Sequence, residues 1–434
     1  MRYRKFNYKS KEELLDEASS IGVALPYADS VSELLKPYEL CGKHLENKIV
    51  IQPLEGCDAD EKAAPGELTR RRYRRFVQGG AGLVWFEATA IVPEGRAQAH
   101  QLMMNEKNVD AYKYLVEEIK ETCLKTKGYE PVIIQQLTHS GRYSKPNGFS
   151  EPWIARNNPL LEREKPIENS RIITDSNLKR IEETYYEAAR LSAAAGFDGA
   201  DVKACHGYLG SELLAAFTRK GEYGGSYENR TRFLKNSILA VRSATPETFI
   251  VSTRLGLTDY FPYPYGWGVV QENGSSKIDL TEPLRLIDEL KSLVGLKVLN
   301  VSIASPYVNP HISRPYERGG YEPDEHPLKG VARFIETICE VQEKNKELPI
   351  INAGFSYLRQ FAPNVAAGAL EKGAGTLAGF GRAIFANPDL PRQLYEHGCV
   401  DEKRTCVSCS LCTDHLRKGC STGCFIRDRE IYHD

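Results

Sequence analysis

The sequence predicts a closed (β/α)8 TIM barrel with an N-terminal helical extension and a C-terminal cysteine-rich tail. Eight short, almost wholly apolar segments alternate with helical segments along the chain. Strands of a parallel barrel are covered on both faces, so each is expected to be apolar throughout. The 434 residues suit one barrel with appendages, because such barrels range from about 200 to more than 400 residues. We assign residues 1–40 to the extension, 41–398 to the barrel and 399–434 to the tail.

The eight expected strands are residues 49–53, 82–88, 131–137, 197–202, 249–255, 297–303, 349–353 and 374–378. Residues 69–78 are expected to form the helix that follows the first strand. Near the N-terminus, residues 11–18 and 30–35 space their apolar side chains as short amphipathic helices do. We interpret these two helices as a cap packed on the barrel, with a dimer contact as the alternative.

The charge balance argues against a polyanionic partner. The chain has 57 Lys and Arg residues against 58 Asp and Glu residues, so its net charge is close to zero. Binding to nucleic acid or to an anionic membrane surface usually draws on an excess of positive charge. No apolar run follows the basic N-terminus, and none elsewhere approaches the length that crosses a bilayer. We therefore expect a cytoplasmic protein that acts on small organic molecules, with neither nucleic acid nor membrane as a partner.

Three proton-handling side chains follow the expected fourth strand, residues 197–202. They are Lys203, His206 and Tyr208, and catalytic groups of barrel enzymes lie at such strand ends. Activation of a carbonyl group needs two hydrogen-bond donors at one oxygen and a proton source nearby. Each residue alone is more often a solvated or structural side chain, but the three together predict acid-base chemistry.

Six of the 11 cysteines lie between residues 399 and 424. Cys406, Cys409 and Cys412 are each separated by two residues, and Cys420 and Cys424 follow. A tight loop with this spacing can turn three thiolates onto one face of a 4Fe–4S cluster, with a fourth cysteine further along the chain. Zinc is the structural alternative, and free or redox-active thiols are the third. In a reducing compartment, metal binding is favoured over disulfides.

The region from residue 196 to 233 resembles the fourth strand and following loop of the old yellow enzyme family, FMN-dependent ene-reductases on a (β/α)8 barrel. The loop carries the sequence Tyr-Gly-Gly-Ser-Tyr-Glu-Asn-Arg. His206 and Tyr208 match the family, whereas Lys203 stands where relatives usually have histidine. An ammonium group is a compact charge on a flexible stem rather than a fixed imidazole. The resemblance implies that Lys203 and His206 hold a substrate carbonyl oxygen and that Tyr208 donates a proton.

The resemblance extends to other strand ends and implies an FMN site. The corresponding residues are Pro53, Leu54, Glu55, Ala88, Gln136, Arg254, Gly354, Gly381 and Arg382. In the family, the glutamine hydrogen-bonds the pyrimidine edge of the flavin, and the arginine lies beside N1, where positive charge stabilises the reduced ring. The two glycines and Arg382 correspond to the phosphate-binding turns of the last two strands. Glu55 replaces the usual Thr or Cys, so we expect either a raised carboxyl pKa or a side chain turned away.

The tail resembles that of the 2,4-dienoyl-CoA reductase branch of this family, in which cysteines hold an iron–sulfur cluster. The resemblance implies the ligands Cys406, Cys409, Cys412 and Cys424, with Cys420 competing for the fourth place. The third spacing is one residue shorter here than in those relatives. Relatives in that branch carry FAD and NAD(P)H domains after the cluster, whereas this sequence ends at Asp434. NADH, NADPH and ferredoxin therefore all stay open as the electron donor.

Two long loop regions, residues 258–277 and 305–328, are rich in aromatic rings. The rings are Tyr260, Phe261, Tyr263, Tyr265, Trp267, Tyr307, Tyr316 and Tyr321. Such rings can line an apolar pocket, and anchoring of the loops is the equal alternative. A bulky, apolar substrate is the hypothesis that such rings fit, and the family resemblance implies reduction of its C=C bond conjugated to a carbonyl group. The alternatives are an electron-transfer protein without an organic substrate and a dehydrogenase of amines or saturated ketones. A homo-oligomer and a redox partner protein are both compatible with the sequence.

Overall fold

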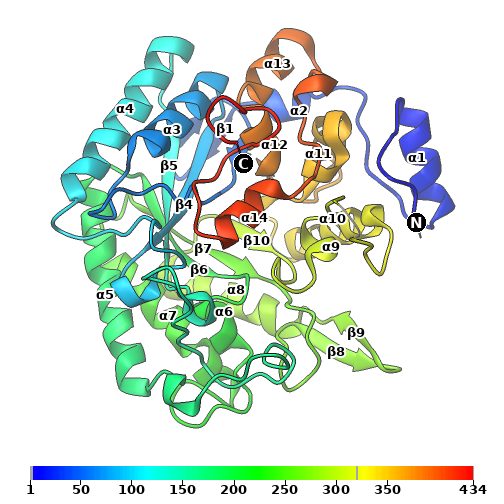
Figure 1. Ribbon diagram of the computed structural model, residues 1–434. Coiled ribbons are helices and arrows are strands. Elements are labelled where there is room, and N and C mark those ends of the chain that lie inside the picture. Colours follow the sequence, from blue (N-terminus) through cyan, green and yellow to red (C-terminus); the bar gives the residue numbers. More distant parts are fainter. Residues whose placement is uncertain (1–2, 319–320, 434) are drawn as a thin grey trace.

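The computed structural model, which describes residues 3–318 and 321–433, contains a closed barrel of parallel strands surrounded by helices (Figure 1). Around the barrel the strands follow the order β3, β4, β5, β6, β7, β10, β11 and β12, and β12 pairs again with β3. Their bounds are Ile49–Ile51, Leu83–Ala90, Val132–Thr138, Gly199–Ala204, Ile250–Gly256, Leu299–Ser302, Ile350–Asn352 and Leu377–Phe380. All neighbours are parallel, so the carboxyl ends of the strands meet at one rim. The predicted (β/α)8 class is confirmed.

Helices connect the strands and cover the outside of the barrel. Their bounds are α1 Lys11–Ser20, α2 Ser32–Leu35, α3 Glu67–Gly79, α4 Val109–Lys127, α5 Asp175–Ala194, α6 Leu209–Leu214, α7 Tyr227–Ser243, α8 Thr281–Val294, α9 Pro310–Ser313, α10 Pro327–Lys344, α11 Ala362–Glu371, α12 Arg382–Ala386, α13 Leu390–His397 and α14 Leu411–Arg417. Short 3₁₀ turns lie at Pro93–Gly95, Gly141–Tyr143, Asn169–Arg171, Phe355–Phe361 and Glu402–Arg404. Helix α3 contains the predicted helix 69–78 and buries Thr69, Tyr73, Phe76 and Val77, which are spaced as one helical face requires.

Each predicted strand overlaps an observed strand, and the differences lie at the ends. β12 begins later than predicted because Gly375, with a φ of 97°, turns the chain just before it. β4 continues past its predicted end to Ala90, beyond an irregularity in pairing between Phe86 and Thr89. These shifts leave the strand order unchanged, and the carboxyl ends still meet at one rim.

One buried cluster fills the amino-terminal half of the barrel interior. Its members are Leu40, Leu45, Val50, Leu83, Trp85, Val132, Ile134, Ile250, Val298, Ile351 and Leu377. Leu40 and Leu45 come from the antiparallel hairpin of β1 (Tyr38–Leu40) and β2 (Lys43–Leu45). This hairpin therefore closes the amino-terminal end of the barrel, and the carboxyl end is the one available for a site.

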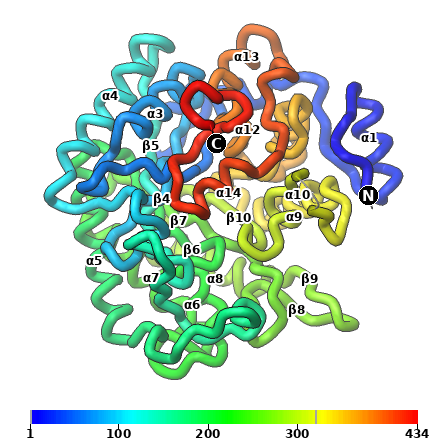
Figure 2. The backbone as a smooth tube through the Cα atoms, viewed as in Figure 1, coloured from blue at the N-terminus to red at the C-terminus, as the bar shows by residue number. Residues whose placement is uncertain are grey.

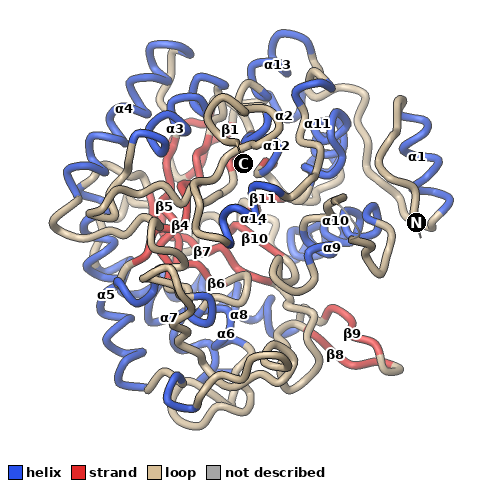
Figure 3. The backbone as a smooth tube through the Cα atoms, in the orientation of Figure 1, coloured by secondary structure: helices blue, strands red, loops and turns tan. Residues whose placement is uncertain are grey.

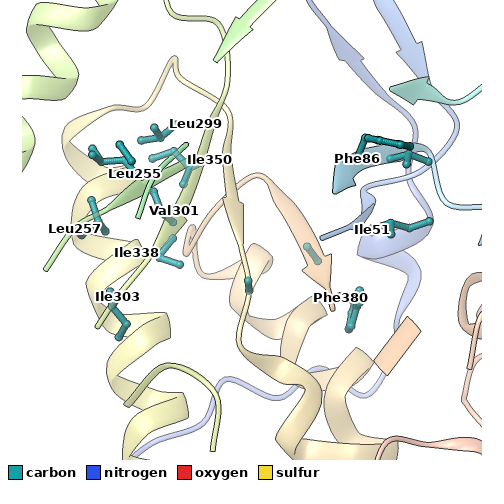
Figure 4. Packing of buried hydrophobic residues seen from close by; sticks show 14 of the residues in the cluster. Ile51, Phe86, Leu255, Leu257, Leu299, Val301, Ile303, Ile338, Ile350 and Phe380 are labelled. Atoms are coloured by element: carbon teal, nitrogen blue, oxygen red, sulfur yellow. The ribbon is translucent and has the colours of Figure 1, made fainter. Parts of the chain in front are cut away.

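A second buried cluster lies between the strands and the helices around them. Figure 4 shows Val301 of β10 beside Ile338 of α10, and Ile51 and Phe380 from two paired strands. Leu255 of β7 is fully buried in the same cluster. Burial of such a side chain stabilises the fold by about 1.5–3 kcal/mol relative to exposure. This packing fixes the strand ends on which the site depends.

The N-terminal segment packs on the outside of the same chain. The Phe6 ring lies 5.5 Å from the Tyr357 ring and 4.9 Å from the Tyr8 ring, each edge to face. The backbone N–H of Ala28 donates to the carbonyl of Asn364 in α11. Figure 1 shows α1 at the edge of the molecule, away from the strands. The structure thus has the extension as a cap on the helical layer.

The region 258–277, expected to be a loop, contains an antiparallel hairpin. Strands β8 (Val269–Glu272) and β9 (Ser275–Ile278) flank Asn273 and Gly274, which have φ values of 49° and 78°. An Asn-Gly pair with two positive φ angles is the preferred two-residue hairpin turn. Figure 3 shows the two strands projecting from the body of the protein.

The C-terminal tail returns across the carboxyl rim of the barrel. In Figure 2 it runs as a red tube in front of the strands, and α14 lies close to their ends. The Thr422 N–H donates to the Gly56 carbonyl at 2.7 Å, and Asp428 forms ion pairs with Arg71 and Arg75 of α3. Among the described helices, none has the length and apolar character needed to span a bilayer.

Candidate active site at the carboxyl end of the barrel

Two connected cavities lie at the carboxyl ends of the strands. The inner cavity has a volume of about 200 Å³, and the outer cavity has a volume of about 690 Å³. Both are lined by Glu55, Tyr208, Tyr307, Leu416 and Arg417, so the outer cavity leads into the inner one. Leu416 and Arg417 belong to α14, which means that the tail completes the wall of both cavities.

The inner cavity brings together most of the residues predicted from the sequence. It is lined by Pro53, Leu54, Glu55, Lys203, His206, Tyr208, Arg254, Gly354, Gly381 and Arg382. These residues come from five strand ends that are far apart in the sequence. Ala88 and Gln136, in contrast, are not among the described residues that line it.

The buried Gln136 is directed toward the barrel interior instead. Its amide donates to a carboxylate oxygen of Asp201 at 2.5 Å, and the Trp85 indole N–H donates to the same oxygen at 2.7 Å. The other oxygen of Asp201 accepts the backbone N–H of Arg254 at 2.6 Å. Burial raises the pKa of the Asp201 carboxyl, and these hydrogen bonds oppose the shift. Asp201 therefore holds the strand end that carries Arg254, a role that the sequence analysis missed.

His206 lies in a strained turn directly after β6. It has a φ of 64° and is followed by Gly207 with a φ of 72°. A non-glycine residue in this left-handed region is uncommon and is often found at functional sites. Its Nε2 lies 3.0 Å from the Ser302 hydroxyl. Burial, and then the positive charges of Arg254 and Lys203, lower the pKa of the His206 imidazole well below 6.5, so the ring is neutral.

Lys203, Tyr208 and Glu55 form one buried network. The Lys203 ammonium lies 3.5 Å from Glu55 Oε1 and 3.8 Å from the centre of the Tyr208 ring. The Tyr208 hydroxyl donates to the same Glu55 oxygen at 3.3 Å and lies 3.3 Å from the Tyr307 hydroxyl. Burial and the Glu55 carboxylate raise the pKa of the Tyr208 phenol well above 10. The phenol therefore stays protonated at neutral pH.

The Glu55 side chain turns toward Lys203 and Tyr208 and lines both cavities. The physical reason is the adjacent ammonium, which compensates a carboxylate at this depth. Gln101 supports the second carboxylate oxygen through a hydrogen bond of 3.2 Å, and it also donates to the Ala88 carbonyl at 3.1 Å. Ala88 thus takes part in the site through its backbone.

Positive charge dominates the inner cavity. Lys203, Arg254, Arg314, Arg382 and Arg417 line it, against the single carboxylate of Glu55 in its described lining. Burial, and then repulsion by Arg382 and Arg417, lower the pKa of the Arg314 guanidinium to about 10. Such a cluster of cations is stable only with an anionic ligand or with solvent among them.

Several buried polar atoms of this cavity have no partner within the described part of the chain. They are Nε of Arg254, Nε of Arg417, Oγ of Ser313 and the side-chain nitrogen of Gln52. Gly354 supplies a wall without a side chain at a φ of 93°, where a Cβ would approach Phe334 to 3.4 Å. Donors, positive charge and close backbone approach are what a phosphate and an electron-rich ring require, so the residues present fit FMN.

Four tail cysteines lie close enough to influence one another. Burial first, and then Cys406 and Cys409 among other groups, raise the pKa of the Cys412 thiol. Burial raises the pKa of Cys424 to about 11, with Cys406 and Cys412 adding to the shift. Cys420 is exposed. Cys406, Cys409, Cys412 and Cys424 therefore lie in one part of the tail, and their role as ligands stays a prediction.

Backbone N–H groups point at two of these sulfurs. The Ser408 N–H donates to Cys406 Sγ at 3.4 Å, and the N–H groups of Ile426 and Arg427 bond to Cys424. Such bonds stabilise thiolates and accompany iron–sulfur ligation. Within residues 3–318 and 321–433 no three Cys, His, Asp or Glu side chains converge on a single-ion site. One zinc ion needs sulfurs about 2.3 Å from one point, whereas a 4Fe–4S cluster takes one thiolate at each of four irons.

The aromatic loops contribute less to the cavities than predicted. Of the eight loop rings, only Tyr307 lines either large cavity in the described structure. Trp267 is buried and donates to the Gly256 carbonyl, while Tyr316 stacks on Tyr321 with ring centres 4.0 Å apart. Most of these rings therefore anchor the loops to the scaffold, and the apolar pocket expected from them is not formed.

Two arginines of the site were missed in the sequence. Arg314 follows α9 in a long loop, and Arg417 ends α14 in the tail. Neither residue lies at the end of a barrel strand. Each is in a segment that comes back to the cavity after a long stretch of chain. The available signal for Arg417 was its place in the helix that contains Cys412, the third cysteine of the series.

The sequence and the structure resemble known flavoproteins. Residues 33–267 match the profile of the NADH:flavin oxidoreductase / NADH oxidase family. The NADPH dehydrogenase of Clostridium acetobutylicum is 30% identical over 281 residues, which cover 64% of this chain and 76% of that protein. The cinnamate reductase of Clostridium sporogenes is 26% identical over 416 residues, covering 92% of this chain and 58% of that protein.

Among solved structures, a 2-naphthoyl-CoA reductase in complex with 2-naphthoyl-CoA superposes with a TM-score of 0.74 at 20% sequence identity. The match covers 92% of this chain and 57% of that one. At this identity the likeness concerns the fold. The chain spans little more than half the length of the cinnamate and naphthoyl-CoA reductases.

Proposed function

Because the chain belongs to the NADH:flavin oxidoreductase / NADH oxidase family and is an FMN-dependent oxidoreductase, we propose that it reduces a C=C bond conjugated to a carbonyl group. One observation carries this proposal. The same cavity is lined by arginines that suit a flavin and its phosphate, and by Lys203, His206 and Tyr208. An electron-transfer protein has no need for Lys203, His206 and Tyr208 in that position. A reductase of a carbon–carbon bond needs both a carbonyl-polarising pair and a proton donor.

Arg254, Arg314, Arg382 and Arg417, together with the backbone around Gly354, are the groups that would hold FMN. When bound, FMN supplies a hydride from its N5 position to the β-carbon of the substrate. Arg254 is held by Asp201 through its backbone, so its guanidinium is positioned without a carboxylate of its own. Its free Nε is then available to the electron-rich side of the ring.

Lys203 and His206 polarise the substrate carbonyl in this proposal. The ammonium of Lys203 is a full positive charge in a buried wall, and the neutral His206 ring has one N–H to donate. Both side chains are held in place before substrate binds. Glu55 and Tyr208 hold the Lys203 ammonium, and Ser302 holds the His206 ring. Preorganised donors of this kind act on the charge that develops on the oxygen during reduction.

Tyr208 protonates the α-carbon. Its phenol stays protonated because burial and Glu55 raise its pKa, so a proton is available at neutral pH. Glu55 acts as a positioning residue, since one of its oxygens binds both the Lys203 ammonium and the Tyr208 hydroxyl. Tyr307 lies within hydrogen-bond distance of Tyr208 and lines the outer cavity, which gives a route for the return of a proton from solvent.

Cys406, Cys409, Cys412 and Cys424 would hold a 4Fe–4S cluster in the same proposal. Cys412 immediately precedes Thr413, which lines the inner cavity, so the cluster site adjoins the flavin site. A cluster in that place fits electron delivery to the flavin from NAD(P)H or from a redox partner protein. The dehydrogenase alternative finds no specific support in the geometry.

The proposal is tested with Tyr208→Phe in deuterated water. Wild-type enzyme is expected to convert benzylideneacetone to the saturated ketone with one deuterium at the α-carbon. The variant keeps the aromatic ring but lacks the hydroxyl group that donates the proton, so turnover is expected to fall about 10²–10⁴-fold. Reduction of the bound flavin by the electron donor should be unchanged. Equal turnover with full α-deuteration in the variant would rule out Tyr208 as the acid.

A further inference from the structure

The outer cavity carries positive charge that, apart from Arg417, the proposed function does not use. Lys145, Lys165, Arg171 and Arg417 line it. In the described part of the chain none of the four has a carboxylate partner. Lys145 donates to the backbone carbonyl of Arg417, and the Arg171 guanidinium lies 5.8 Å from the centre of the Trp153 ring.

A fifth cation of the same wall provides an internal comparison. Arg142 forms ion pairs with both Glu162 and Glu212, and its charge is therefore compensated within the fold. The carboxylates that face the cavity are Glu168, an acceptor for the Ser170 hydroxyl, and Glu55, already paired with Lys203. The positive charges of Lys145, Lys165, Arg171 and Arg417 are therefore not fully compensated by carboxylates of the cavity wall.

The side chain of Arg417 is held in place by its neighbours. Its guanidinium donates to the Pro306 carbonyl at 2.7 Å and lies 5.0 Å from the centre of the Tyr307 ring. Its Nε is buried and has no partner in the described structure. The side chain is thus held in one orientation at the junction of the two cavities while part of its hydrogen-bonding capacity stays unused.

The remaining wall of the outer cavity is aromatic and apolar. The Tyr143 and Tyr307 rings stack with centres 3.8 Å apart and an angle of 12° between their planes. Pro152, Leu161 and Ile167 complete this surface. A molecule that extends from the inner cavity would therefore lie along apolar groups and end among cations.

We propose that the outer cavity binds an anionic group, a carboxylate or phosphate, that the substrate carries at a distance from its C=C bond. This inference rests on the proposed function, because it extends the substrate outward from the carbonyl that Lys203 and His206 hold. It replaces the bulky, apolar enone expected from the sequence with an amphipathic one. The ligand preference arises from charge and hydrogen bonds to Lys145, Lys165, Arg171 and Arg417.

The test compares para-carboxybenzylideneacetone with its neutral methyl ester. Dissociation constants are measured by calorimetry on the oxidised holoenzyme, and kcat/KM is measured with dithionite as reductant, so that no nucleotide is present. The variant is Lys165→Gln with Arg171→Gln, and the control is Lys107→Gln with Arg163→Gln, two exposed cations outside the cavity lining. We expect the acid to bind about fivefold more tightly than the ester, a preference lost in the variant and kept in the control.

Equal binding of acid and ester by the wild-type enzyme would overturn the proposal, as would a preference that survives in the variant. If the variant instead slows reduction by NADH or NADPH without changing the binding of the acid, the charge serves the electron donor and the proposal is wrong. If neither enone is reduced but the acid still binds preferentially, the anion site stands and the proposed ene-reduction fails.

Discussion

The buried Glu55–Lys203 pair offers a quantitative test of the site's electrostatics. The two charged atoms lie 3.5 Å apart, and the side chains are 9% and 5% exposed, respectively. With an effective dielectric constant of about 20, their attraction is at most about 5 kcal/mol. Loss of solvation offsets much of this, so the whole pair contributes little net stability. Removal of one partner, however, leaves an uncompensated buried charge, which costs about 3–5 kcal/mol.

A double-mutant cycle separates these effects. Glu55→Gln keeps an acceptor for Tyr208, and Lys203→Met keeps the volume of the stem. We expect each single variant to lower the free energy of unfolding by about 3 kcal/mol and the double variant to lie within about 1 kcal/mol of wild type. Urea unfolding of the flavin-loaded protein, followed by tryptophan fluorescence, measures all four species.

The matched control is the exposed helical pair Glu121–Lys125, separated by 2.9 Å. The same substitutions there should give a coupling energy of about 0.3–0.5 kcal/mol. If the losses of Glu55→Gln and Lys203→Met simply add to within about 0.5 kcal/mol, the two groups do not interact as described and Glu55 does not position Lys203.

Two further predictions concern the tail and the pH dependence of stability. Cys424→Ser should remove most of the iron that copurifies with the protein, whereas Cys420→Ser should keep it. The opposite result in an iron assay would show that Cys420, and not Cys424, is the fourth ligand. Burial lowers the pKa of the His139 imidazole from 6.5 to about 4. The unfolded chain therefore binds this proton first as the pH falls, and stability due to His139 is present above about pH 6.5 and is lost toward pH 4. The loss between pH 8 and pH 5 amounts to about 2 kcal/mol. In urea unfolding, His139→Gln should flatten that part of the profile, and an unchanged slope would contradict this origin.

The barrel could be predicted because its strands are buried on both faces. A parallel strand such as β5 has no solvent face, and its sequence begins with an apolar run, Val132 to Ile134, before the polar side chains nearer its carboxyl end. Lys203 follows from this pattern, since the carboxyl ends meet at one rim, whereas Arg254 and Gly354 were expected from the resemblance to the flavoprotein family. The hairpin at Asn273–Gly274 could also have been predicted from its turn residues.

The direction of individual side chains and the course of long connections could not be predicted from the sequence. The amide of Gln136 turns to Asp201 because an otherwise unpaired buried carboxylate requires donors. The pairing of Glu55 with Lys203 joins distant segments, and only the closure of the barrel brings them together. Arg417 reaches the cavity because the tail folds back over the rim.

The central claim is that this cavity binds FMN and passes reducing equivalents to a conjugated C=C bond. The most direct test is to reduce the purified protein with dithionite without oxygen and add benzylideneacetone while recording the flavin absorbance. The account predicts bound FMN that is reoxidised with one equivalent of saturated ketone formed. Protein without flavin, or reduced flavin that no activated enone reoxidises, would contradict it.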